Sequence, residues 1–543
     1  MSFFMEDQAR DLWATKQGWK IGFVLRQGAL VLLTIGLALA CGRTVLDERR
    51  APAVGGGAGT RVPPDLPPPA FPCADLQPLA EAVLTPRHVV RVLFAPDRSS
   101  LVLQVKGEGP SGSSIPDDLL LVRLPSGEVS PIISSIASAE WLQPGTTLLV
   151  TAIQEGRSDL VVVNVDGSGL RTLVQGVCDY VAAPDGSLVY ATHDCDQYGH
   201  GAVDVIDVAS GAGARLAVYG ELGTSRGYTV SPDGRWAALQ TFIPLNGGAN
   251  QWVLALGSAG GRVETLASQP GASNPAFVSD RLLLFESPGQ NWNNGGIRGH
   301  VPGTGDTSYS IAAERTPGEF GYQVSPDGKW LLGAALVTPF LTELYAIRLD
   351  GTGELLLASD LDTYPLNMES VRVFAFSASG RVIYNTSEDL AVATVGLDAS
   401  KPTVLSGNAD FLEAPWLDQV ALLAPAASEP EAFRLRLVDL QSGTDVFAYD
   451  SDSDGYVRTI GFPPSGRGLV FTESRSSGPS RLRYASADQS LVLGEWQTTQ
   501  FVPQRWSDTP PLATYPLDPT GCFTVFDTDL APGPGTRLAL LPQ

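Results

Sequence analysis

Two of the four histidines in this chain lie close together beside two aspartates. The stretch "THDCDQYGHG" contains His193, Asp194, Asp196 and His200. Neutral imidazoles and carboxylates are ligands for zinc and similar ions, so these four residues are a candidate metal site. The stretch also follows an apolar strand, where polar residues collect in ordinary surface loops, and a plain polar loop is the alternative interpretation.

A second carboxylate group lies in "YDSDSDGYVR", which contains Asp450, Asp452 and Asp454. Alternating carboxylates followed by glycine are typical of the start of a calcium loop, because a hard cation takes several oxygen ligands. An EF-hand would need glutamate where Gly461 stands, and Arg458 occupies another ligand position. We expect no cofactor, with calcium at these aspartates as the exception to test. A solvated acidic connection is the alternative.

We find no set of residues that is typical of an enzyme. Residues 223–227, "GTSRG", match the Gly-x-Ser-x-Gly sequence pattern of a hydrolase nucleophile motif. That motif has meaning only on a strand-to-helix turn with histidine and aspartate partners in later segments, and this sequence predicts a strand here. The formal net charge of −22 excludes nucleic acid as a partner, because phosphate binding needs clustered lysine and arginine.

The first forty residues predict a signal peptide. Four basic residues precede the apolar run "GALVLLTIGLALA", which is too short to span a bilayer comfortably. The run ends in "LALACG", and its small residues beside Cys41 resemble a bacterial lipoprotein signal, in which the cysteine becomes the lipidated first residue. Ala38 stands where leucine is usual, and the charged leader is long. An uncleaved membrane anchor is the alternative to residues 1–40 as a signal and Cys41 as a lipidation site.

Residues 41–74 predict a tether between the lipid and the folded body. The segment is rich in glycine, proline and arginine and shows no apolar period. Gly42, rather than aspartate, follows the lipidated cysteine. If the cell has two membranes, this favours the outer one, with the body in the periplasm or at the cell surface.

The rest of the chain is built from repeats. "GYTVSPDGRW" begins at Gly227 and "GYQVSPDGKW" begins 94 residues later, at Gly321. The same pattern of apolar residue, turn and apolar strand recurs ten times, at steps of 40 to 52 residues. The copies lie at Phe94, Trp141, Ala182, Val230, Phe277, Val324, Phe376, Trp416, Phe462 and Trp506.

Each repeat predicts two hairpins and therefore a four-stranded antiparallel sheet. Pro-Asp-Gly forms the first turn, and Asp-Gly or Ser-Gly forms the second, as at Asp166-Gly167 and Asp350-Gly351. A sheet with two apolar faces must be sandwiched by its neighbours, and such sheets at this period are propeller blades. We predict an all-β propeller over residues 75–543, with eight to ten blades in one ring. Two tandem rings are the alternative.

The repeat resembles that of the TolB-type propeller, which is WD-repeat-like. The residues that carry the likeness are Trp506-Ser507-Asp508 and the segment 164–169, "NVDGSG", within a region of about residues 85–543. The resemblance implies an envelope protein that binds other proteins. This chain departs from that family in having more than six units and no amino-terminal α/β domain.

Four cysteines remain after Cys41, and a ring predicts how they pair. Cys178 and Cys195 flank the turn of the third unit almost symmetrically, so they should face each other across two strands. Cys73 precedes the first unit and Cys522 lies in the last, so a closed ring would bring them together. Disulfides are expected outside the cytoplasm. Buried free thiols are the alternative.

These features favour a lipid-anchored propeller of the cell envelope that binds a protein or glycan partner without catalysis. The alternative is a metal-dependent propeller enzyme, such as a lactonase or hydrolase, with a site on the ring axis. That enzyme would need acidic and histidine residues from several inner strands. The inner strands read as mostly apolar or small, which counts against it.

Overall fold

The protein is described here from a computed structural model. Contacts divide the chain into Met1–Val54 and Gly55–Gln543, and every described residue belongs to the second unit. No helix among the described residues is long and apolar enough to span a membrane. The structure describes residues 73–540 except 80–82, 88, 96–98, 108–115, 143–144, 198, 223–229, 245–249, 268–272, 280–281, 288–295, 304–307, 313–316, 339–340, 351, 360, 362–373, 387–390, 399–400, 414–417, 426–432, 452–454, 464–467, 476–478, 498–521 and 529–534.

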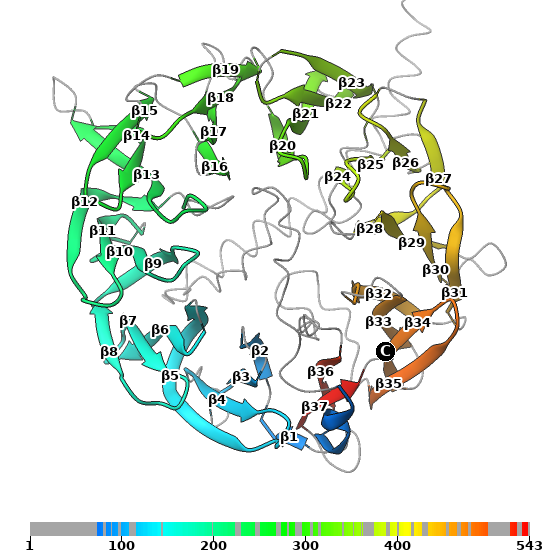
Figure 1. The fold of residues 1–543 in the computed structure, drawn as a ribbon, viewed down its shortest axis with the longest axis horizontal. Coiled ribbons are helices and arrows are strands. Elements are labelled where there is room, and N and C mark those ends of the chain that lie inside the picture. Colours follow the sequence, from blue (N-terminus) through cyan, green and yellow to red (C-terminus); the bar gives the residue numbers. More distant parts are fainter. Residues whose placement is uncertain are drawn as a thin grey trace, which may run out of the picture. The chain divides into compact units, whose positions relative to one another are not determined.

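The second unit is a ring of antiparallel sheets, as the sequence predicted (Figure 1). Blades 1 and 2 contain β2 (Val89–Phe94), β3 (Ser100–Val105), β4 (Asp117–Arg123), β5 (Val129–Leu142), β6 (Thr147–Gln154), β7 (Arg157–Asn164) and β8 (Arg171–Val174). Blades 3 and 4 contain β9 (Val177–Ala182), β10 (Leu188–His193), β11 (Gly201–Asp207), β12 (Gly213–Leu222), β13 (Trp236–Pro244), β14 (Asn250–Ser258) and β15 (Val263–Ala267).

Blades 5 to 9 are five separate four-stranded sheets. Blades 5 and 6 contain β16 (Ser273–Ser279), β17 (Leu282–Ser287), β18 (Gly296–His300), β19 (Ser308–Ala312), β20 (Pro317–Val324), β21 (Trp330–Thr338), β22 (Leu341–Arg348) and β23 (Glu354–Ala358). Blades 7 to 9 contain β24 (Phe374–Phe376), β25 (Val382–Asn385), β26 (Val392–Val395), β27 (Thr403–Ser406), β28 (Asp410–Glu413), β29 (Gln419–Pro425), β30 (Phe433–Asp439), β31 (Asp445–Asp450), β32 (Gly455–Gly461), β33 (Gly468–Arg475), β34 (Pro479–Ser486) and β35 (Ser490–Gln497).

The closing blade joins the two ends of the folded body. Its strands are β36 (Phe523–Thr528), β37 (Gly535–Leu540) and β1 (Val83–Thr85), in the order β1-β37-β36, and the short 3-10 helix η1 (Cys73–Leu79) precedes β1. The repeat copy at Trp506 lies outside the described residues. Counted over the described residues, the chain forms ten blades when each seven-stranded sheet is divided at its shared strand.

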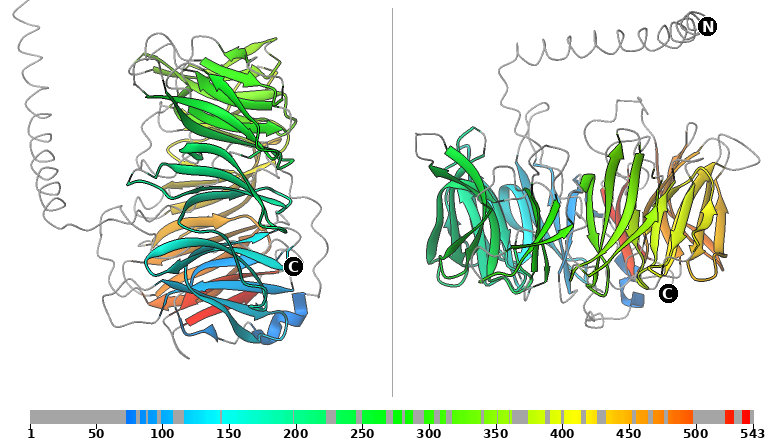
Figure 2. Two further views of the ribbon diagram at one scale, coloured as in Figure 1. Left: turned by 90° about the vertical axis from the view of Figure 1, so that its left-hand side faces the viewer. Right: turned by 90° about the horizontal axis from the view of Figure 1, so that it is seen from above.

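The two shared strands carry the chain from the outside of one blade to the inside of the next. The first half of β5 pairs with β4, and its second half pairs with β6. Ser135, at φ 61°, marks the change of direction between the halves. In the same way, β12 pairs first with β11 and then with β13. Figure 2 shows from the side how the strands of successive blades lie face to face.

The hydrophobic cores lie between blades rather than within them. Successive residues of one strand alternate between two cores: Leu148 and Val150 of β6 pack against blade 1, whereas Leu149 packs against blade 3. Each of the nine core clusters of the described chain joins residues of two neighbouring blades. A blade therefore buries its two apolar faces only through its neighbours, and this requirement explains the ring.

The two similar decapeptides form the same turn in blades 4 and 6. In each turn, the serine hydroxyl donates to the aspartate Oδ1 at 2.6 Å and accepts from the tryptophan N–H, at 3.0 Å for Ser231 and 2.9 Å for Ser325. Gly234 and Gly328 have φ angles of 73° and 67°, which glycine adopts without steric penalty. The sequence Ser-Pro-Asp-Gly thus encodes a hairpin between the inner two strands of a blade.

Both predicted disulfides are present. Cys73 of η1 bonds Cys522 beside β36, with a Cα–Cα distance of 5.3 Å, and Cys178 of β9 bonds Cys195 after β10, at 6.4 Å. Leu76 and Leu79 of η1 pack into the core between blade 1 and the closing blade. The first and last blades therefore meet in one ring, and the prediction of one ring over two tandem rings is confirmed.

Candidate functional site

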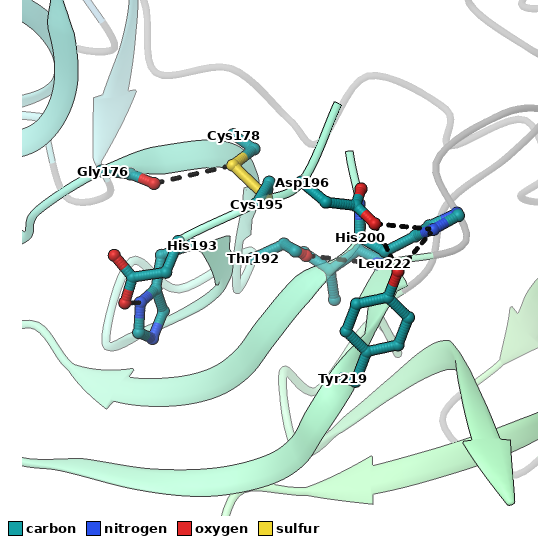
Figure 3. Close-up of a disulfide and its surroundings, with 10 residues drawn as sticks. Gly176, Cys178, Thr192, His193, Cys195, Asp196, His200, Tyr219 and Leu222 are labelled. Carbon is teal, nitrogen blue, oxygen red and sulfur yellow. Dashed lines mark hydrogen bonds and ion pairs between the residues drawn. A yellow bond between two sulfur atoms is a disulfide. The ribbon is translucent and has the colours of Figure 1, made fainter. Parts of the chain in front are cut away.

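The loop between β10 and β11 of blade 3 carries the histidine–aspartate group that the sequence singled out. The Cys178–Cys195 disulfide fixes this loop to β9 (Figure 3). The backbone N–H of Asp194 donates to the carbonyl oxygen of Gly176 at 3.0 Å. At the end of the loop, a Cβ atom on Gly201 would lie 2.2 Å from the carbonyl oxygen of His193, so only glycine fits there. The loop is held by covalent, backbone and steric restraints together.

His193 lies between two carboxylates. Its Nδ1 atom is 3.0 Å from Asp194 Oδ2, and its Nε2 atom is 3.0 Å from Asp204 Oδ2 on β11. Arg215 of β12 donates in turn to Asp204. Both ring nitrogens are therefore engaged by carboxylates of the protein itself. This arrangement satisfies an imidazole side chain and leaves neither nitrogen directed at an added ion.

Asp196, His200 and Tyr219 form a separate group on the other side of the disulfide, as Figure 3 shows. The Tyr219 hydroxyl donates to Asp196 Oδ2 and lies 3.3 Å from His200 Nδ1. The rings of His200 and Tyr219 meet edge to face, with centroids 5.7 Å apart. These residues make a compact polar and aromatic surface on blade 3.

The four predicted metal ligands are thus divided between two groups. His193 and Asp194 belong to the first group, and Asp196 and His200 belong to the second. Within the part of the chain that the structure describes, no three or more histidine, cysteine, aspartate or glutamate side chains are placed to hold a metal ion. The metal site remains a prediction without structural support.

An exposed apolar pair adjoins the second group. The pairing of β11 with β12 shifts register between Gly201 and Val203, because two residues of β12 lie opposite one residue of β11 there. This bulge leaves the neighbouring residues Val218 and Tyr219 both exposed, Val218 at 80%. The loop and the bulge together present apolar, aromatic and acidic side chains on a rigid blade.

Most of the remaining predicted metal and lipidation residues lie outside the described residues. Asp450 is the last residue of β31, and Arg434 Nε lies 3.7 Å from its Oδ1 atom. Asp452 and Asp454 lie outside the described residues, and so does the predicted lipidation site, Cys41. Calcium binding and lipidation are therefore still predictions.

The structure also reveals a polar cluster that sequence reasoning missed, on the inner strands of blades 1 to 3 and the adjoining strand β6. Arg91 of β2 donates to the carbonyl oxygen of Ala139 at 3.1 Å. Ser138 of β5 donates to Thr151 at 3.0 Å, and its hydroxyl lies 3.5 Å from that of Tyr180 on β9. Glu140 lies on β5 in the same cluster. The residues Arg91, Ser138, Glu140, Thr151 and Tyr180 are called the inner-strand cluster below.

Glu140 is the unusual member of the inner-strand cluster. Burial raises the pKa of its carboxyl group to about 7, although the nearby Arg91 guanidinium opposes the shift. Burial and the Glu140 charge also raise the pKa of Tyr180 to about 12, so its hydroxyl stays protonated. A carboxyl group that titrates near neutrality is a frequent mark of functional sites. The available sequence signal was a single glutamate in the apolar inner strand "SIASAEWL".

Comparisons with known proteins give the fold context. No protein-family model matches this sequence, and no curated protein matches it. Among solved structures, the dipeptidyl peptidase 4 of Porphyromonas gingivalis is similar over 71% of this chain and 65% of its own length, with 12% identity and a TM-score of 0.44. This chain therefore spans less than two thirds of that peptidase.

Two further solved structures show the range of the likeness. A eukaryotic initiation factor is similar over 69% of this chain and 93% of its own length, with 12% identity and a TM-score of 0.43. A prolyl endopeptidase is similar over 63% of this chain and 55% of its own, with 11% identity and a TM-score of 0.34. What the strand pairing and the cores establish for this chain is a β-propeller.

Proposed function

We propose that this protein is a lipid-anchored β-propeller of the bacterial cell envelope that binds a protein or glycan partner without catalysis. The observation that carries the proposal is the blade 3 surface formed by Asp196, His200, Val218 and Tyr219. Its loop is locked by the Cys178–Cys195 disulfide, and its bulge exposes an apolar and an aromatic side chain. Such a preformed surface loses little conformational entropy when it binds a partner.

The location in the envelope rests on the cysteines. Two disulfides within one chain are typical of proteins that fold in an oxidising compartment. The lipoprotein-like signal before Cys41 supplies the anchor, and the proline- and glycine-rich tether supplies distance from the membrane. The resemblance to the TolB-type repeat, and with it an envelope role, is part of the same proposal.

The test is capture of envelope proteins and glycans by the full-length chain, compared with two matched variants. Val218→Ala changes the blade 3 surface, whereas Val404→Ala changes a similarly exposed valine on β27 of blade 7, 65% exposed. We expect a reproducible partner that the wild type and Val404→Ala retain and that Val218→Ala retains at severalfold lower yield. Val218 is exposed, so the substitution should leave the fold intact.

Two results would count against this function. Equal yields of the partner from both valine variants would remove the blade 3 surface from the proposal. Stoichiometric zinc, manganese or calcium in the purified protein, together with hydrolysis of a lactone or ester, would favour the enzyme alternative. The lipid anchor is tested separately, because Cys41→Ser should move the protein from the membrane fraction to the soluble fraction.

A further inference from the structure

The inner-strand cluster brings together polar side chains from three successive blades. Arg91 comes from β2, Ser138 and Glu140 come from β5, and Tyr180 comes from β9. In Figure 1, β2 and β9 are the strands of blades 1 and 3 nearest the centre of the ring. A cation, a carboxyl group and two hydroxyl groups therefore converge on neighbouring inner strands.

Glu140 is not satisfied by the protein around it. Its Oε1 atom is closed to solvent and has no hydrogen-bond partner among the described residues. Leaving such a group unpaired destabilises the fold. The residue as a whole is only half-buried, and the terminal torsion of a glutamate rotates easily, so either oxygen can be presented at the open side.

A buried carboxylate in blade 9 shows how this chain satisfies a glutamate that serves structure alone. Glu473 is fully buried, and it accepts from the Tyr449 hydroxyl at 3.1 Å and from Arg483 Nε at 2.9 Å. Arg91, by contrast, directs its hydrogen bond at a backbone carbonyl rather than at Glu140, and its side chain remains exposed. The inner-strand cluster therefore holds a carboxyl oxygen without a described partner and an exposed guanidinium group.

The charges of the cluster define the class of ligand. The charges of Arg91 and Glu140 oppose each other, so the pair favours neither a cationic nor an anionic ligand at this position. A neutral group that donates to one residue and accepts from the other is repelled by neither. Adjacent hydroxyl groups and peptide groups both have this property.

The geometry of the bridge decides between these two neutral groups. The N–H and the C=O of a trans peptide group point in opposite directions, so one peptide group does not bridge two side chains that lie on the same side of it. Two adjacent hydroxyl groups can each donate and accept, so one contacts Glu140 while its neighbour contacts Arg91. Adjacent hydroxyl groups are therefore the better partner.

We propose that Arg91, Ser138, Glu140 and Tyr180 form a binding site for a neutral saccharide, in which adjacent sugar hydroxyls bridge Glu140 and Arg91. This inference deepens the proposed function and rests on it, because it makes the partner a glycan. Ser138 and Tyr180 add hydroxyl groups that both donate and accept. The site lies on rigid inner strands of neighbouring blades, so its geometry is set before the sugar arrives.

The experiment is saturation-transfer NMR on the full chain with three neutral disaccharides, maltose, lactose and cellobiose, and with the neutral peptide probe N-acetylglycine N-methylamide. We expect saturation transfer to at least one disaccharide and none to the peptide probe. Glu140→Ala and Arg91→Ala should each weaken that binding by about 10-fold or more, because each removes a hydrogen bond to a charged group. Glu140→Gln keeps the shape and should weaken it by only severalfold.

The matched control is Glu128→Ala, which removes an exposed carboxylate between β4 and β5 and should leave sugar binding unchanged. Thermal unfolding of each variant shows whether the fold survives. The saccharide site is wrong if no disaccharide gives a signal, if the signal persists in the folded Glu140→Ala and Arg91→Ala variants, or if the peptide probe binds instead. Partner capture through Val218 would still stand in those cases, so failure of this inference is separable from failure of the scaffold function.

Discussion

Single residues decide whether the repeated turns close, and the two similar decapeptides offer an internal comparison. Gly234 and Gly328 occupy the same position in turns with the same hydrogen bonds. A Cβ atom on Gly234 would lie 2.7 Å from the Cβ atom of Ala183 in blade 3. A Cβ atom on Gly328 would have no described atom within 4 Å. Substitutions at these two glycines therefore distinguish the effect of backbone strain from the effect of contact between blades.

We expect Gly328→Ala to lower the free energy of unfolding by about 1 kcal/mol, because an L-residue is disfavoured at positive φ. Gly234→Ala carries the same strain and also overpacks a close contact, which should remove about 1–3 kcal/mol more. Denaturant unfolding of both variants measures the difference. Equal losses would mean that blades 3 and 4 separate easily enough to accept the added methyl group.

The sequence identified residues whose roles are local and missed those whose roles depend on neighbouring blades. The Ser-Pro-Asp-Gly turn was predictable because its hydrogen bonds join residues five positions apart or fewer. Glu140 was not, because the residues with which it interacts electrostatically, Arg91 and Tyr180, come from other blades. His193 and His200 were noticed together, yet the chain turns them to opposite sides of a disulfide that spacing alone does not orient.

At the scale of elements, several hairpins between the outer two strands of a blade share one hydrogen-bonded turn. In four blades, an aspartate at the turn accepts the hydroxyl and the backbone N–H of a serine or threonine two or three residues later. These bonds hold the pKa of each aspartate below its usual range. The four residues are Asp166, Asp207, Asp350 and Asp439.

The sign of the resulting pH dependence follows from the lowered pKa values. The unfolded chain binds protons at these aspartates more readily than the folded chain, so their contribution is complete above the unfolded pKa and is lost as the pH falls. We expect the melting temperature to decrease as the pH is lowered past about 4, where ordinary aspartates become protonated. Asp350→Asn combined with Asp166→Asn should make that fall shallower. An unchanged slope between pH 5 and pH 2.5 would show that other carboxyl groups dominate.

The hairpins within blades were predictable from the sequence, but the strands that the chain shares between two blades were not. Asp-Gly and Ser-Gly turns between alternating apolar residues specify a hairpin by themselves. The continuous strands β5 and β12 have no comparable local signal, since the change of partner occurs at one kinked residue in β5 and at a bulge in β12. The exposed Val218 and Tyr219 result from that bulge, which explains why the blade 3 surface could not be read from the sequence.

At the scale of the whole molecule, closure of the ring depends on contacts between residues that are far apart in the chain. Strand β1 pairs with β37, Leu76 and Leu79 pack against Phe523, and a disulfide joins residues separated by 449 positions. The pairing of Cys73 with Cys522 was predictable because a closed ring brings the chain ends together. The same reasoning gave no sheet order for the closing blade, whose outer strand comes from the start of the folded body.

The two disulfides should therefore differ in what they stabilise. In the chain-entropy model, a link that closes 449 residues restricts the unfolded chain by about 6 kcal/mol, whereas one that closes 17 residues restricts it by about 3 kcal/mol. We expect Cys73→Ser with Cys522→Ser to lower the unfolding midpoint more than Cys178→Ser with Cys195→Ser. Limited proteolysis should cut the first double variant earliest near η1 and β36, because strand pairing of β1 with β37 and core packing are what still hold the two ends of the folded body together once the disulfide is removed. If the short-loop variant is the less stable of the two, the blade cores alone hold the ring closed and the Cys73–Cys522 link adds little to them.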